Sequence, residues 1–244
     1  TMWLGESELK AAMQLDARST PLGKFTVKVK DVDAVDGINP LLKTVMGNSD
    51  LYLDGSSDFD ININTKGINI AELKSLATGT VKVSMAKTVV HGVDLDHASR
   101  SVVAEYANKN NFRTRQSYVP EYKPDLATEF DSLNATFKVA SGKLINKDLS
   151  LVSASANITG SGTIDVINGK LDYSPVIDIK VKNRVDIRDK LRDHPMEYHA
   201  QGTFENIETT FKLDKYELLV GRLLVQESKA RKYKQMNTEK KKLW

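Results

Sequence analysis

The sequence has no cysteine in 244 residues, so neither a disulfide framework nor a metal centre with thiolate ligands is available to it. This absence also suits an oxidising compartment, where a free thiol would be at risk. No apolar run approaches the ~20 residues that a membrane-spanning helix requires. The first residues lack both the basic and the apolar region of a signal peptide. We therefore expect a water-soluble part of a longer protein.

Most of the chain also lacks an excess of either charge. Lys and Arg total 35 against 32 Asp and Glu, which gives a net charge of +3. The excess is confined to residues 227–244, where seven basic residues stand against two acidic ones. The body of the chain is therefore nearly neutral and lacks the broad basic surface that binds nucleic acid. A short run of aromatic and basic residues at 112–118 is expected to be a solvated loop.

The basic tail has two interpretations. Its cations could contact anionic lipid headgroups, each adding about 1 kcal/mol of attraction, or the tail could be solvated and disordered. The candidates for headgroup contact are Lys229, Arg231, Lys232, Lys240, Lys241 and Lys242.

Alternation of apolar and polar residues is abundant, and Gly or Asn-Gly separates the alternating runs, most clearly over residues 130–173. This period is typical of a meandering antiparallel sheet with one apolar face. The phase slips between Leu151 and Ala154, which predicts a turn or bulge near Val152 and Ser153. We expect a mainly β fold, namely an elongated, curled antiparallel sheet with a few short helices and a C-terminal helix.

Helices are predicted at four places. Asn39 as N-cap and Pro40 at the first helical position open one that continues to about Val45. Two others are predicted at about 70–77 and 97–109.

The last predicted helix begins near Asp214 and is expected to fray in its polar C-terminal part. Between the helices, residues 108–128 contain two prolines and predict a loop. The residues that the last helix should turn toward one side are Tyr216, Leu218, Leu219, Leu223 and Leu224.

Histidine and carboxylate residues do not form a convincing metal site. The stretch from His91 to His97 has four possible ligands, but a strand end and a helix cap account for them. The stretch from Asp31 to Gly37 is similar to a calcium loop in the wrong register, with Leu42 at the position of the bidentate Glu.

Catalytic motifs are missing as well. Gly160-Ser161-Gly162 precedes an alternating strand and not a helix, so we expect a bulge or a close strand crossing in place of a phosphate loop. No Gly-x-Ser-x-Gly elbow and no cysteine nucleophile occur. We expect no enzymatic activity and no cofactor.

A series of motifs runs through the chain in a fixed order. They are Asn39-Pro40-Leu41-Leu42-Lys43, Asp50-Leu51-Tyr52-Leu53-Asp54-Gly55, residues 59–63, Thr65-Lys66-Gly67, residues 71–76, Gly79-Thr80-Val81, Gly92-Val93-Asp94-Leu95 and the alternating segment 130–173. This order resembles the C-terminal region of the AsmA family over roughly residues 35–205. One departure is Ala86-Lys87-Thr88, which stands where that family usually has a glycine turn.

AsmA-family proteins are bacterial envelope proteins with a membrane anchor and a large periplasmic β-rich body. The resemblance implies a periplasmic protein that an N-terminal segment, outside this chain, attaches to the inner membrane. It also implies lipid transport and outer-membrane biogenesis, as in the related TamB-like proteins with their lipid-lined grooves. The expected organisation is a sheet domain over residues 1–212, with the loop at 108–128, followed by a C-terminal helix and basic tail over 213–244.

A sheet with one apolar face has to cover that face. The predicted helices are too short for so many strands, which leaves a curled sheet whose apolar side forms a trough. Such a trough can bind acyl chains at about 0.8 kcal/mol for each buried methylene. The sequence pattern alone is equally compatible with a packed β core in a ligand-free scaffold that acts through protein contacts. The resemblance to the AsmA family favours the trough, with phospholipid as the expected partner. The predicted lining residues are Phe59, Ile61, Ile63, Val81, Val83, Phe137 and Val139.

Overall fold

The described part of the chain folds around one antiparallel sheet of eleven strands. The strands follow one another in sequence order, and each pairs with the next. The computed structural model describes residues 2–4, 7–16, 19–46, 51–92, 95, 108–110, 127–154, 156–180, 195–211 and 213–242.

Most of the strands are long for a globular protein, and β4 reaches 15 residues. The strands are β1 (Met2–Leu4), β2 (Ser7–Asp16), β3 (Leu22–Asp33), β4 (Tyr52–Lys66), β5 (Thr78–His91), β6 (Ala127–Ala140), β7 (Lys143–Val152), β8 (Ala156–Asp165), β9 (Lys170–Ile179), β10 (Met196–Thr203) and β11 (Asn206–Phe211).

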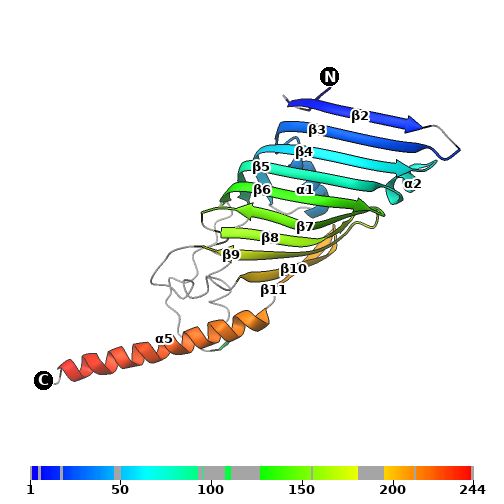
Figure 1. Cartoon of the computed structure of the whole chain (residues 1–244). Helices are drawn as coiled ribbons and strands as arrows, with labels where there is room; N and C mark the ends of the chain where they lie inside the picture. Colours follow the sequence, from blue (N-terminus) through cyan, green and yellow to red (C-terminus); the bar gives the residue numbers. More distant parts are fainter. Residues whose placement is uncertain are drawn as a thin grey trace.

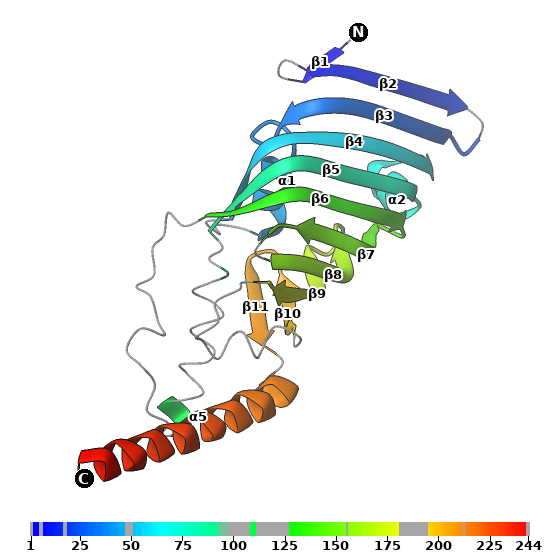
Figure 2. The same ribbon diagram turned by 60° about the vertical axis from the view of Figure 1, so that its left-hand side comes forward.

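The molecule is elongated in the direction that crosses the strands (Figure 1). β1 and β2 lie at one end near the N-terminus, and β11 lies at the other end. The sheet curls along this direction, so that β7 to β11 turn away from the plane of β2 to β6 (Figure 2). Because β1 and β11 do not pair, the sheet stays open. This confirms the elongated, curled antiparallel sheet expected from the alternation.

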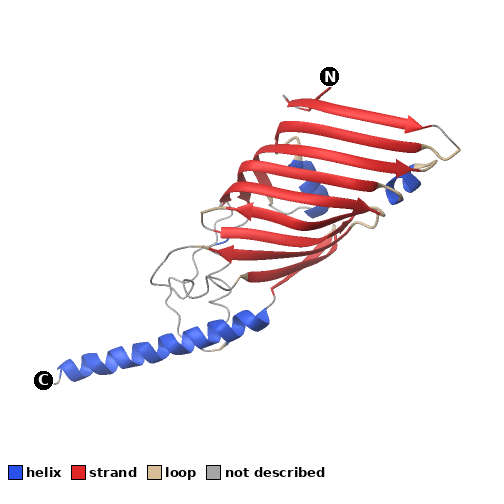
Figure 3. Cartoon of the chain, in the orientation of Figure 1, coloured by secondary structure: helices blue, strands red, loops and turns tan. Residues whose placement is uncertain are grey.

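Three helices accompany the sheet in the described residues (Figure 3). α1 (Ile38–Met46) connects β3 to β4, and α2 (Ile70–Ser75) connects β4 to β5. α5 (Leu213–Lys242) follows β11 at the C-terminal end. The helix predicted at 97–109 falls almost entirely outside the described residues. The predicted loop at 108–128 is too long at its end, since β6 already begins at Ala127.

The hydrophobic core lies under α1. Val32 is fully buried and Phe59 nearly so, and Ile38 and Leu42 of α1 pack against this cluster. The core continues along the same face of the sheet through β5, β6 and β7. Its further members are Val29, Ala34, Leu53, Val83, Met85, Val90, Leu95, Phe130, Leu133, Leu151 and Ala156.

Asn39 does not cap α1, in contrast to the prediction. The helix begins one residue earlier, at Ile38. The Asn39 side chain instead acts as a substitute for a neighbouring strand: its Oδ1 accepts from the Leu53 amide at 2.9 Å and its Nδ2 donates to the Leu53 carbonyl at 2.8 Å. The registered pairing between β3 and β4 ends at Ser56, so this side chain ties α1 to the start of β4.

The predicted turn after Leu151 is confirmed. β7 ends at Val152, and the Ser153 hydroxyl accepts from the Ala156 amide at 2.9 Å as β8 begins. The region of Ala86 to Thr88 forms no turn: β5 continues through it with a bulge at Lys87, where φ is +52°, opposite Gly55 of β4. A bulge lets the strand bend without ending the pairing.

α5 differs from the expectation in two ways. It stays helical to Lys242, where fraying was predicted. It also buries Val220, Leu223 and Leu224 while Leu218 is 67% exposed, so Leu218 does not share their side. None of the helices in the described part of the chain combines the length and the apolar character needed to cross a membrane.

Candidate functional site

An unbroken row of apolar side chains and glycines crosses ten strands on one face of the sheet. Each member is the direct cross-strand partner of the next, from β2 to β11. Only Val139 and Leu171 are buried, and the other members keep exposed surface. This row, called the apolar lane, consists of Met13, Phe25, Ile63, Gly79, Val139, Leu144, Ile164, Leu171, Gly202 and Ile207.

The two short helices lie on either side of the lane where it crosses β4. α1 lies beside Phe59, since its residues Ile38 and Leu42 pack against the core cluster to which Phe59 belongs. α2 lies over Thr65, whose hydroxyl donates to the Leu73 carbonyl. Ile61 and Ile63 stand between these positions on the same face of β4, and both are only partly buried. The helices therefore leave a strip of apolar surface between them.

The seven residues predicted to line a trough all lie on this face of the sheet. The structure divides them into two groups. Phe59 and Val83 belong to the packed core, with exposures of 8% and 6%, and Val139 is also buried at 6%. These three are therefore not available as open lining. The four that keep partial exposure are Ile61, Ile63, Val81 and Phe137.

The sequence reasoning missed Phe25, Leu144 and Ile164 as lining residues. Alternation marks the face on which each lies, but the cross-strand register decides whether the rows join. The turns at Ser141-Gly142 and Asn168-Gly169 carry that information, because a hairpin turn fixes which residues face each other. With these turns in place, Val139 pairs with Leu144 and Ile164 pairs with Leu171.

A buried polar cluster centred on Asn146 lies beside the lane. Asn146 is 1% exposed. Its Nδ2 donates to the Thr136 carbonyl at 3.0 Å and to Asp148 Oδ1 at 2.8 Å. Its Oδ1 accepts from the Leu149 amide at 3.2 Å and from the Tyr173 hydroxyl. These bonds satisfy the side chain at the place where the registers of β6–β7 and β7–β8 shift, so the cluster holds a bulge together.

Gly160 and Gly162 make room for the Tyr173 ring. A Cβ on Gly160 would stand 2.8 Å from the ring, and one on Gly162 would stand 2.5 Å from it. Of the predicted bulge or close strand crossing, the structure has the bulge, since the register of β7 and β8 shifts between Asn146 and Leu149, opposite this glycine pair. Burial, together with the negative charge of Asp148, raises the pKa of Tyr173, so its hydroxyl stays protonated and can donate to Asn146.

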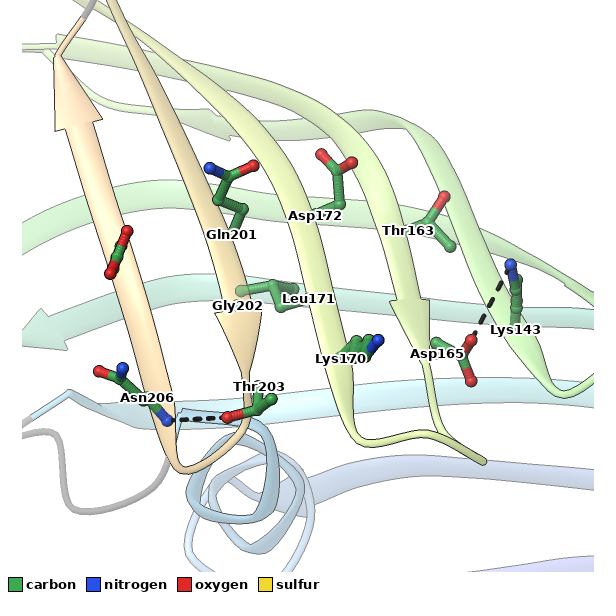
Figure 4. Close-up of a pocket in the computed structure, with 11 residues that line it drawn as sticks. Lys143, Thr163, Asp165, Lys170, Leu171, Asp172, Gln201, Gly202, Thr203 and Asn206 are labelled. Atoms are coloured by element: carbon green, nitrogen blue, oxygen red, sulfur yellow. Dashed lines mark hydrogen bonds and ion pairs between the residues drawn. The ribbon is translucent and has the colours of Figure 1, made fainter.

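An open polar cavity of about 710 Å³ lies at β7 to β11, and most of its lining residues are on the face opposite the lane, although Leu171 and Gly202 belong to both. Figure 4 shows Thr163, Asp172 and Gln201 on adjacent strands, where they are direct cross-strand partners. Lys143 and Lys170 supply positive charge at its rim. The other lining residues are Asp165, Leu171, Gly202, Thr203, Asn206 and Glu208.

Asp165 at the rim of this cavity is held by the turn that follows it. Asn168 donates to its carboxylate from both the side chain and the backbone amide, each at 2.9 Å. These hydrogen bonds, with a smaller contribution from Lys143 at 3.9 Å, lower the pKa of Asp165. The Asp165 carboxylate thus closes the β8–β9 turn.

Ser174, His199 and Asp172 have the residue types of a hydrolytic triad but not its geometry. His199 Nδ1 lies 3.1 Å from the Ser174 hydroxyl. Its Nε2 lies 3.8 Å from Asp172, beyond hydrogen-bonding distance, and 3.2 Å from Gln201 Oε1. The carboxylate does not orient the imidazole, which is what a triad requires.

His91 is bound to a neighbouring strand and not to a metal cluster. Its Nε2 lies 2.7 Å from Asp54 Oδ2, and its ring stacks on Tyr52 with centroids 4.1 Å apart. Asp94, Asp96 and His97 lie outside the described residues. Within the ranges that the structure describes, no group of three or more His, Cys, Asp or Glu side chains could hold a metal ion.

The basic candidates of the tail lie on α5. Lys229 and Lys232 are exposed, and Arg231 pairs with Glu227 at 3.1 Å. The side chains of Lys240, Lys241 and Lys242 lie outside the described part. No family model matches the chain, and neither the curated proteins nor the solved structures contain a significant match to it.

Proposed function

We propose that this chain is a non-enzymatic module that binds the acyl chains of phospholipids along the apolar lane. The observation that carries the proposal is the continuity of the lane over ten strands, together with the exposed surface that most of its members keep. An apolar row of this length, most of whose members keep exposed surface, is favourable for a hydrocarbon ligand.

The dimensions of the lane support a lipid as the ligand. Nine inter-strand steps separate β2 from β11, and at ~4.8 Å a step the lane is about 40 Å long. The acyl chains of one leaflet extend roughly 15 Å, half of a ~30 Å hydrocarbon core. The lane is therefore longer than a single acyl chain, and each methylene that it buries contributes about 0.8 kcal/mol.

The envelope setting of the proposal comes from the motif order that resembles the AsmA family. We propose that the chain belongs to a periplasmic protein attached to the inner membrane and that it supports lipid transport and outer-membrane assembly. The absence of cysteine and the nearly neutral body are compatible with this setting.

Site-specific photocrosslinking tests whether lipid occupies this face. The probe p-benzoylphenylalanine is placed either at Phe137, which is partly exposed on the apolar face, or at Lys138, which is exposed on the opposite face. After expression in bacteria and irradiation, we expect phospholipid adducts from position 137 and few or none from position 138, as measured by mass spectrometry of the intact protein.

Two outcomes contradict the proposal. One is equal crosslinking from both positions, which indicates non-specific contact with lipid. The other is the absence of phospholipid from both the adducts and an organic extract of the purified chain, with circular dichroism showing an intact sheet. The second outcome favours the ligand-free scaffold.

A further inference from the structure

α5 has a second apolar surface that is unrelated to the sheet. Tyr233 and Leu218 are 70% and 67% exposed, and Val225 and Met236 are also exposed. With ~100° between successive residues of an α-helix, these four side chains fall in one sector about 80° wide. They form a stripe along most of the helix, which is roughly 45 Å long at 1.5 Å a residue.

The stripe lies on the side of α5 away from its buried residues. Val220, Leu223 and Leu224 are 1%, 8% and 5% exposed and fall about 140° to 240° from Leu218 around the helix. Beyond residue 227, every side chain from 228 to 238 is exposed. A helix without a packed face is marginally stable by itself, so this half of α5 is expected to gain order from a partner surface.

Basic side chains lie on the same side of α5 as the apolar stripe. Arg222, Lys229 and Lys232 are exposed and fall within about 40° of Leu218 around the helix. The helical segment 228–242 has seven basic residues and one acidic residue. Apolar and basic side chains thus share one side of α5, and a lipid surface that is anionic outside and apolar beneath can contact both kinds.

Other partners fit this stripe less well. A second copy of the helix would bring Lys229 and Lys232 of two chains together, and like charges oppose such pairing. Nucleic acid would use the cations, but Leu218, Val225 and Met236 have no role in phosphate contact. A lipid surface uses both kinds of side chain.

We propose that α5 binds flat on an anionic lipid surface through this stripe, which consists of Leu218, Arg222, Val225, Lys229, Lys232, Tyr233 and Met236. This site is distinct from the apolar lane and does not depend on it. It places the β11 end of the sheet at the membrane, because both views show α5 beyond β11 and away from β1 and β2 (Figures 1 and 2).

Vesicle co-sedimentation of the whole 244-residue chain tests the proposal. We expect binding to vesicles of phosphatidylglycerol and phosphatidylcholine in equal parts, and little binding to phosphatidylcholine alone. The affinity should fall as salt is raised, because headgroup attraction is screened within a Debye length of ~8 Å at physiological ionic strength.

Two matched charge reversals locate the binding face. Lys232→Glu lies within the stripe, whereas Lys234→Glu lies about 160° from Leu218, on the opposite side. Both lysines are exposed and both variants change the net charge equally. We expect Lys232→Glu to weaken binding by at least about tenfold and Lys234→Glu to weaken it much less.

A second pair tests the apolar contribution without a change of charge. Met236→Gln removes an exposed apolar side chain of the stripe, and Thr238→Gln alters an exposed residue on the opposite side. Only the first should reduce binding, by severalfold.

Equal losses within either pair, or no binding of the intact chain to anionic vesicles, would overturn the proposal. Phospholipid adducts at position 137 report on the lane separately, so either site can fail while the other stands.

Discussion

Single side chains hold the sheet together where its regular pairing fails. Tyr173 crosses two glycines to reach Asn146, and Asn146 with Asp148 binds the backbone groups that the bulge leaves without strand partners. Because every member of this cluster is bonded to another, each deletion removes a hydrogen bond from a neighbouring polar group.

Removing the hydroxyl of Tyr173 should cost a modest amount of stability. In Tyr173→Phe the ring still fills the space over Gly160 and Gly162, while Asn146 Oδ1 keeps only the Leu149 amide as donor. We expect the free energy of unfolding to fall by about 1–2 kcal/mol, as measured by urea denaturation. An unchanged or increased stability would show that the hydroxyl bond contributes nothing.

The raised pKa of Tyr173 predicts that the folded state loses stability at alkaline pH. The pKa of Tyr173 is raised in the folded state by burial and by Asp148, so the unfolded chain loses this proton first, near pH ~10. The unfolded state is thereby favoured, and stability contributed by the protonated hydroxyl declines as the pH rises above ~10. Tyr173→Phe should show a smaller decline between pH 9 and 11 than the parent chain, roughly over that window.

A substitution in the glycine pair should disturb the packing of Tyr173 more strongly and cost more stability. A methyl group in Gly162→Ala would stand 2.4 Å from the Asp172 carbonyl and 2.5 Å from the Tyr173 ring, so backbone and ring must both shift. We expect a loss of about 1–3 kcal/mol or more. Ser161→Ala, at the exposed position between the glycines, serves as the control and should change stability by less than ~0.5 kcal/mol.

At the scale of elements, the position of α1 relative to β4 depends on one side chain. α1 is tied to β4 by the paired hydrogen bonds of Asn39 with Leu53. Asn39→Ala should leave both backbone groups without their partner and cost about 2 kcal/mol. Asn39→Asp keeps the acceptor for the Leu53 amide but loses the donor, so urea denaturation should place it between the parent and Asn39→Ala. Equal stability of all three chains would contradict this role.

Elements and faces follow from the sequence more readily than their contacts. The period of two identified the strands and their apolar face, and Asn69 with Glu72 gives α2 a recognisable start. The pattern around Asn39 predicted a cap because local chemistry allows one, yet a strand 14 residues away competes for the same side chain. The prediction for Leu218 was wrong because a count of apolar residues ignores their angle around the helix.

The sequence predicted on which face of the sheet the apolar lane lies, but not how many strands it crosses. Alternation placed Ile61, Ile63, Val81 and Phe137 together correctly, while the burial of Phe59 depends on α1, which packs from outside the strand. No pattern local to one strand states how far a row continues. The length of the lane comes from nine registers set one after another by turns and bulges.

At the scale of the whole molecule, the lane connects two different ends. It begins near the exposed side chains Met13 and Leu15 of β2 and finishes at Ile207 of β11, beyond which α5 lies. If α5 rests on an anionic membrane and the lane binds acyl chains, lipid entering at β2 has a continuous apolar path toward that membrane. The two proposals together therefore predict transfer and not only storage of lipid.

A charge placed in the middle of the path should slow such transfer. In Ile63→Asp the carboxylate lies in the strip between α1 and α2, where moving an acyl chain past it requires contact between hydrocarbon and a hydrated charge. Asn64→Asp adds the same charge on the opposite face of β4, at an exposed position, and serves as the control. Transfer of a phospholipid with a fluorescent acyl chain between anionic vesicles should be at least severalfold slower with Ile63→Asp, whereas Asn64→Asp should match the parent chain. Because neither variant alters α5, vesicle binding should be equal in all three. Equal transfer rates with intact folding would show that lipid does not travel along this row.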